Sequence, residues 1–163
     1  MGLRDAGTLF FDVVSSSIRP NEANRVALTM VAGTSACVLI ADRHNGLFER
    51  IRGLLETTFD KVFLVTDQSS LIEGAGRLQP TMIVMDLSYA AGDLPGLIRQ
   101  LHDQARGAKL LLLSVHDGPT VVAAAIAAGA DGLVGKRAIG HDLMPAIDAL
   151  LAGRNYFDPG AAH

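Results

Sequence analysis

The 163-residue chain is long enough to bury one full hydrophobic core and too short for two domains of ordinary size. Hydrophobic residues make up 49% and charged residues 19%, which excludes an intrinsically disordered chain. The net charge of -3 offers no basic surface for nucleic acid, and the single cysteine, Cys37, excludes an internal disulfide and fits a reducing compartment. No apolar run is long enough to cross a membrane. We therefore expect a cytoplasmic protein without direct DNA binding.

The first 36 residues differ in pattern from the rest of the chain. Two short apolar patches, at residues 9–14 and 26–31, flank a polar connection. We predict a short helix at the first patch and a second helix capped by Asn21. This N-terminal extension is interpreted as an accessory segment packed on the main domain, with a dimerisation arm as the alternative.

Beyond this extension, unbroken apolar runs alternate with segments of helical periodicity. Runs without polar alternation are typical of strands that are covered on both faces, as in a parallel sheet. We predict strands at residues 37–41, 61–66, 81–86, 109–114 and, very short, 131–135. Cys37 belongs to the first of these runs and is interpreted as a core residue rather than a nucleophile.

A helix is predicted after each strand, because apolar residues recur three and four positions apart. The predicted helices cover residues 47–55, 71–78, 94–101, 119–128 and 143–151. Pro119 suits a first helical position, and Gly129 suits the end of the same helix. Helices between successive buried strands require parallel pairing with right-handed crossovers. The sequence therefore predicts an α/β fold with a doubly wound, five-stranded parallel sheet.

Polar residues stand at the ends of four predicted strands: Asp42, Asp86, Ser114 and Lys136. With strand order 2-1-3-4-5, all four converge on the sheet edge where ligands bind. Together they suit a phosphoryl group, with Asp86 as nucleophile or anchor, Ser114 as a donor to a phosphoryl oxygen and Lys136 as the neutralising charge. For any one of them alone, strand termination and helix capping is the simpler interpretation.

In these segments the chain resembles the receiver domain of bacterial two-component response regulators. The matching segments are residues 38–42, 80–86, 111–114 and 127–136. Residues 114–117 and 152–159 further resemble the LuxR/NarL-type subclass, whose receivers precede a helix-turn-helix domain. The predicted domains are an extension at 1–36, a receiver-like domain at 37–159 and a tail at 160–163.

The resemblance implies a flavodoxin-like (CheY-like) (βα)5 fold and a signalling function without enzymatic activity. It makes Asp86 the phosphoacceptor, Ser114 the switch hydroxyl and Lys136 the phosphate-contacting lysine. Asp42 belongs to the acidic pocket and would ligate Mg²⁺ together with Asp86. The implied partners are a sensor histidine kinase or another signalling protein and a second copy in a homodimer, and the implied context is a LuxR-type transcription factor.

One departure from the family pattern concerns the metal. Receivers usually carry two adjacent acids after the first strand, and here the pair is Asp42-Arg43. A guanidinium removes an oxygen ligand and repels a divalent cation, so we expect weak or absent Mg²⁺ binding. Arg43 is expected either to take the place of the metal and pair with Asp42 or Asp86, or to point to solvent and leave a weak Mg²⁺ site.

Two further departures concern the switch. Tyr89 and Ala90 occupy the positions of a common Met-Pro pair, and Leu133 stands where the family carries an aromatic switch residue. These departures predict a divergent receiver with weakened Mg²⁺-dependent phosphorylation that acts through protein–protein contacts. A conventional Mg²⁺-dependent receiver is one alternative. A small doubly wound enzyme that binds phosphate or nucleotide is another, although the chain lacks a phosphate-binding glycine loop.

Overall fold

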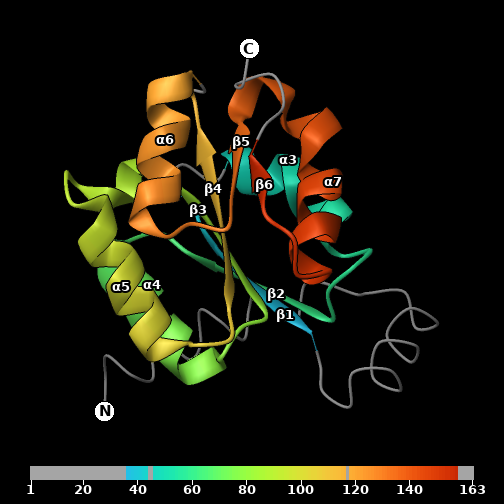
Figure 1. Ribbon diagram of the computed structural model, residues 1–163. Helices are drawn as coiled ribbons and strands as arrows, with labels where there is room; N and C mark the ends of the chain where they lie inside the picture. The colour runs from blue at the N-terminus through green and yellow to red at the C-terminus, as the bar shows by residue number, and fades with distance from the viewer. Residues whose placement is uncertain (1–35, 44–45, 117, 158–163) are drawn as a thin grey trace.

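A parallel sheet runs through the middle of the computed structural model, which describes residues 36–43, 46–116 and 118–157 (Figure 1). Within these residues the strand order is β2-β1-β3-β4-β5-β6, and every neighbouring pair is parallel. The strands are β1 (Cys37–Ala41), β2 (Lys61–Val65), β3 (Met82–Asp86), β4 (Lys109–Ser114), β5 (Gly132–Gly135) and β6 (Tyr156–Phe157). The predicted α/β fold and the order 2-1-3-4-5 of its first five strands are confirmed.

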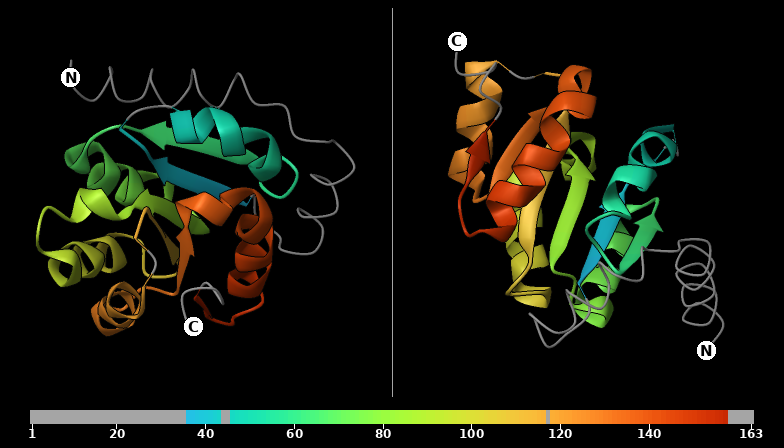
Figure 2. Two further views of the ribbon diagram at one scale, coloured as in Figure 1. Left: turned by 90° about the horizontal axis from the view of Figure 1, so that it is seen from above. Right: turned by 90° about the vertical axis from the view of Figure 1, so that its right-hand side faces the viewer.

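Helices cover both faces of this sheet, as Figure 2 shows from two directions. The α-helices are α3 (Gly46–Leu55), α4 (Gln68–Leu78), α5 (Leu94–Gln104), α6 (Pro119–Ala128) and α7 (Ile139–Leu151). Helices α4, α5 and α6 lie on one face, and α3 and α7 lie on the other. Two short 3-10 helices, η1 (Leu87–Ala90) and η2 (Lys136–Ala138), follow β3 and β5 directly. None of the described helices is long and apolar enough to cross a membrane.

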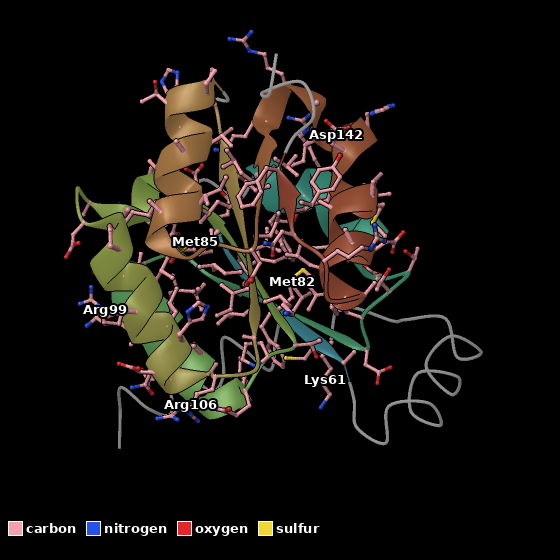
Figure 3. All side chains as sticks on the ribbon, in the orientation of Figure 1. Lys61, Met82, Met85, Arg99, Arg106 and Asp142 are labelled. Atoms are coloured by element: carbon pink, nitrogen blue, oxygen red, sulfur yellow. The ribbon has the colours of Figure 1, made fainter. Side chains whose placement is uncertain are left out.

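Each face of the sheet has its own hydrophobic core, because successive residues of a strand point to opposite faces. In β3, Met85 belongs to the core under α4, α5 and α6, whereas Met82 belongs to the core under α3 and α7 (Figure 3). The neighbouring strand β1 divides in the same way between Leu39 and Ile40, both fully buried. Burial of each such side chain contributes about 1.5–3 kcal/mol. Buried Cys37 lies in the first core, and burial raises the pKa of its thiol to about 11, which confirms its core role.

The ends of α6 follow the predicted chemistry. Pro119 lies in the first turn, where its missing N–H needs no partner, and Gly118 is the N-cap. Gly129 ends the helix with a φ of 100°, a left-handed conformation that glycine adopts without strain. The start and the end of α6 are therefore each marked by the residue type that suits that end.

The strand β6 was not predicted, and it extends the sheet beyond β5. Gly132 permits this pairing, since a Cβ there would lie 2.6 Å from the carbonyl oxygen of Tyr156. A two-residue strand leaves no periodicity to read, although Tyr and Phe are favourable strand residues after the turn at Gly153. The predicted helices of the N-terminal extension and the 160–163 tail lie outside the described residues.

Candidate functional site

Asp42 and Asp86 lie side by side at the carboxyl ends of two neighbouring strands. Ala41 of β1 pairs in register with Met85 of β3, so both aspartates stand one residue beyond a paired position. Adjacent strands are about 4.8 Å apart. Asp42 is 3% exposed, and its Oδ2 accepts a hydrogen bond of 3.0 Å from the backbone N–H of Phe48 in α3. The structure thus brings together the two predicted pocket acids.

Asp86 forms an ion pair with Lys136, which arrives from the far side of β4 at the end of β5. The lysine side chain is 27% exposed and that of the aspartate 16%, so the pair is largely shielded from water. Asp86 is also the N-cap of η1, where its Oδ1 accepts a hydrogen bond of 2.8 Å from the N–H of Ser88.

The pKa of Asp86 reflects a balance between burial and these partners. Burial alone raises the pKa of the carboxyl, because it disfavours the charged form. The hydrogen bonds from Lys136 and Ser88 outweigh that effect and hold the pKa below its usual value of 3.8. Asp86 is therefore an anion at neutral pH, as a nucleophilic carboxylate must be.

Ser114 ends β4 at the same sheet edge and is buried. Its Oγ accepts a hydrogen bond of 3.0 Å from the N–H of His116 in the following loop. In the described part of the chain no hydrogen bond joins Ser114 to Asp86. Because the hydroxyl only accepts in this contact, it can still donate its own hydrogen. The contact is therefore compatible with the predicted role of Ser114 as a donor.

Arg43 follows Asp42, and its guanidinium lies over the ring of Tyr89, with Cζ 4.7 Å from the ring centroid. Within the described ranges no ion pair joins it to Asp42 or Asp86. Arg43 is exposed, as in the alternative in which it points to solvent. It stacks on an aromatic face, however, and does not extend freely into water. Such a cation–π contact stabilises by about 0.5–1 kcal/mol at an exposed site. Sequence reasoning missed this stack.

Tyr89 itself is fully buried, and its hydroxyl has no hydrogen-bond partner within the described residues. Leaving such a group unsatisfied costs about 1–3 kcal/mol. Burial raises the pKa of this phenol to about 12; the nearby cation of Arg43 opposes the rise, and the carboxylates of Asp42 and Asp86 add to it. The backbone oxygen of Tyr89 accepts a hydrogen bond of 2.7 Å from Nε2 of Gln68. The backbone of Tyr89 is thus tied to the start of α4, and its ring contacts Arg43 in the segment that follows β1.

Leu133 lies in β5 and is fully buried in the core under α4, α5 and α6. It carries no polar atom with which to contact Ser114. The same core contains Tyr89, and Phe157 of β6 pairs in register with Leu133. An aromatic residue three positions after Asp86 was visible in the sequence, but its burial against Arg43 was not.

Asp42 and Asp86 supply the carboxylates from which a divalent cation would be held at these strand ends. Mg²⁺ prefers several oxygen ligands in an octahedral arrangement. Three carboxylate oxygens of Asp42 and Asp86 already accept hydrogen bonds, from Phe48, Ser88 and Lys136. Among the described residues no cluster of three or more His, Cys, Asp or Glu side chains is suited to hold a metal ion. The described residues do not form a magnesium site of the three-acid kind.

Comparison with known proteins shows which family this chain resembles. Residues 38–148, more than half of the chain, match the family described as the response regulator receiver domain. The chain is 26% identical over 128 residues to the transcriptional regulatory protein DegU of Brevibacillus brevis, covering 77% of this chain and 54% of that protein. It is 23% identical over 126 residues to the transcriptional regulatory protein MctR of Rhizobium johnstonii, covering 76% and 58%. The chain thus spans little more than half the length of these relatives.

Solved structures agree with this match. A LuxR-family two-component response regulator from Aurantimonas sp. SI85-9A1 superposes with a TM-score of 0.67 at 27% identity, covering 79% of this chain and 94% of that one. The isolated REC domain of RcsB from Salmonella enterica serovar Typhimurium in the apo form gives 0.66 at 26% identity, covering 78% and 96%. The chain therefore belongs to the response regulator receiver domains of two-component signalling, which are signalling modules and not enzymes.

Proposed function

We propose that this chain is a cytoplasmic receiver module of the LuxR/NarL type in which Asp86 is the phosphoacceptor and Mg²⁺-dependent phosphorylation is weakened. Ser114 and Lys136 contact the phosphoryl group, and Asp42 completes the acidic pocket. Output is by protein–protein contact, through a homodimer and through a sensor histidine kinase or another signalling protein. The length of the relatives supports a place as the regulatory part of a LuxR-type transcription factor.

The observation that carries this proposal is the Lys136–Asp86 ion pair at the sheet edge. A partly buried ammonium on the acceptor carboxylate keeps it ionised and stands ready to neutralise a phosphoryl group attached there. The weakening is supported by Arg43, which occupies the position of an acidic ligand and adds positive charge beside Asp42.

Phosphorylation is tested by intact mass after incubation with acetyl phosphate and Mg²⁺. In the reaction an oxygen of Asp86 bonds to phosphorus, the bond from phosphorus to the acetate oxygen breaks, and acetate leaves. We expect a slow, partial adduct on the wild type and none on Asp86→Ala. Arg43→Asp should form the adduct faster, because it restores the pair of adjacent acids after the first strand.

Three other outcomes decide between the alternatives. A rapid, complete adduct on the wild type would make the chain a conventional Mg²⁺-dependent receiver. An adduct that persists in Asp86→Ala would move the acceptor to another residue. Absence of any adduct on both the wild type and Arg43→Asp would remove phosphorylation from the function altogether.

A further inference from the structure

We propose that Arg43, held in place by the ring of Tyr89, is the resident counter-cation of the Asp86 site. When an oxyanion binds at Asp86, Arg43 neutralises its charge, as a divalent cation would otherwise do. The proposal rests on Asp86 being the acceptor, as proposed above, and adds how the site can work without a metal.

The first step is placement. Ala41 and Met85 pair in register, and Asp42 and Asp86 each follow one residue later. Arg43 follows Asp42 directly. Tyr89 lies three positions after Asp86, in the 3-10 turn that Asp86 caps. Asp86 itself has an extended backbone there, and the charge of its carboxylate acts on the phenol of Tyr89. The ring that carries the guanidinium therefore lies close to the acceptor carboxylate.

The second step is the availability of hydrogen-bond donors. A guanidinium that stacks on a ring keeps its five N–H donors in its own plane, where they point away from the ring. In the described part of the chain, Arg43 makes no hydrogen bond or ion pair, and its recorded contact is the face of Tyr89. Its donor edge is thus unused by the described residues, at the same sheet edge where Lys136 is already engaged with Asp86.

The third step is charge. Asp42 and Asp86 are balanced by Arg43 and Lys136, so the site is close to neutral before an oxyanion arrives. An added phosphoryl group or its mimic brings further negative charge. Among the described residues Arg43 contacts the face of Tyr89 and no acceptor, so its donors are available to meet that charge.

The fourth step is the rigidity of the platform. Tyr89 is fully buried in the core under α4, α5 and α6, and Gln68 fixes its backbone oxygen. A fixed ring restricts the flexible arginine side chain, so less conformational entropy is lost when the guanidinium meets an anion. Tyr89 is therefore a positioning residue, acting through Arg43.

The test is binding of beryllium trifluoride, a mimic of the phosphoryl group, to the full chain in magnesium-free buffer, followed by the bound ¹⁹F resonances. We expect the wild type to bind without Mg²⁺ and added Mg²⁺ to tighten binding by less than about threefold. Arg43→Ala should weaken metal-free binding about tenfold or more. Tyr89→Leu should weaken it about two- to fivefold, whereas Tyr89→Phe, which keeps the ring face, should bind like the wild type.

Arg50→Ala is the matched control, because Arg50 is an exposed arginine of the neighbouring α3 and its loss removes the same charge. It should leave binding within about twofold of the wild type. The proposal is overturned if wild-type binding requires Mg²⁺ or if Arg43→Ala binds as well as the wild type without it. Binding by the wild type only with Mg²⁺ would leave the receiver function intact, whereas no binding by any variant, Arg43→Asp with Mg²⁺ included, would remove both.

Discussion

At the scale of single residues, the site is governed by charges that are only partly exposed to water. The Lys136–Asp86 pair connects β5 to β3 and lies mostly out of solvent. Such pairs add little net stability when intact, but removal of one partner leaves the other charge stranded, at a cost of about 3–5 kcal/mol when burial is complete. The pair is thus better suited to fix the geometry of Asp86 than to stabilise the fold.

The lowered pKa of Asp86 predicts a pH dependence of stability. Because the folded pKa lies below the unfolded value near 3.8, the contribution of the charged carboxylate is fully present above that value. It is lost as the pH falls through the lower folded pKa. Urea unfolding of the wild type and Asp86→Asn should therefore give a constant difference in free energy above about pH 5 and a shrinking one below 3.8. A difference that stays constant to the lowest pH would contradict the ion pair.

Tyr89→Phe is expected to stabilise the protein. The change removes a buried hydroxyl that has no partner among the described residues and keeps the ring under Arg43. The free energy of unfolding should rise by about 1 kcal/mol, measured by urea denaturation. A loss of stability in Tyr89→Phe would show that the hydroxyl is satisfied in solution, for example by water.

The sequence was sufficient to place Asp42, Asp86, Ser114 and Lys136 at one sheet edge, because strand order and polar strand ends together determine that edge. It was not sufficient for the contacts between them. Whether Arg43 meets a carboxylate or an aromatic ring depends on side-chain directions that no periodicity encodes. The roles of these residues in phosphoryl transfer remain predictions for the experiments above.

At the scale of secondary-structure elements, the unbroken apolar runs made the first five strands predictable, and Gly129 and Pro119 marked the limits of α6. The short strand β6 was missed because its two residues are identified as a strand only by their pairing with β5, more than 20 positions earlier in the sequence. Helix α7 also begins earlier than predicted, at Ile139, because η2 leads into it directly from β5. The local pattern of apolar residues was thus sufficient to locate the strands and helices. Where some of them begin and end depends on contacts between residues distant in sequence.

Gly132→Ala is expected to disturb the β5–β6 edge. A Cβ at this position would lie 2.6 Å from the carbonyl oxygen of Tyr156 and 3.1 Å from a methyl group of Leu150. Backbone cannot give way cheaply, so we expect a loss of about 1–3 kcal/mol in thermal or urea unfolding. Gly140→Ala is the matched control in α7, where nothing lies within 4 Å of the added carbon. There the helix should gain about 0.5–1 kcal/mol. Equal effects at both sites would contradict the close approach of β6.

At the scale of the whole molecule, one sheet separates two cores, and the same strand supports both. Leu39→Ala removes packing under α4, α5 and α6, and Ile40→Ala removes packing under α3 and α7. Each should cost about 2–5 kcal/mol. Since both residues are fully buried in the interior strand β1, we expect one cooperative transition in each variant, with the same midpoint by circular dichroism and by tyrosine fluorescence. Separate midpoints would mean that the two layers unfold independently.

The ion pair of Asp86 and Lys136 joins residues 50 positions apart, with η1, α5, β4, α6 and β5 between them. On the ribosome, where chains grow at about 5–20 residues per second, Asp86 therefore waits seconds for its lysine. A nascent chain released before β5 contains the aspartate but lacks the cation that pairs with it. The ion pair thus forms only when the sheet is nearly complete, and a truncated product carries Asp86 without Lys136.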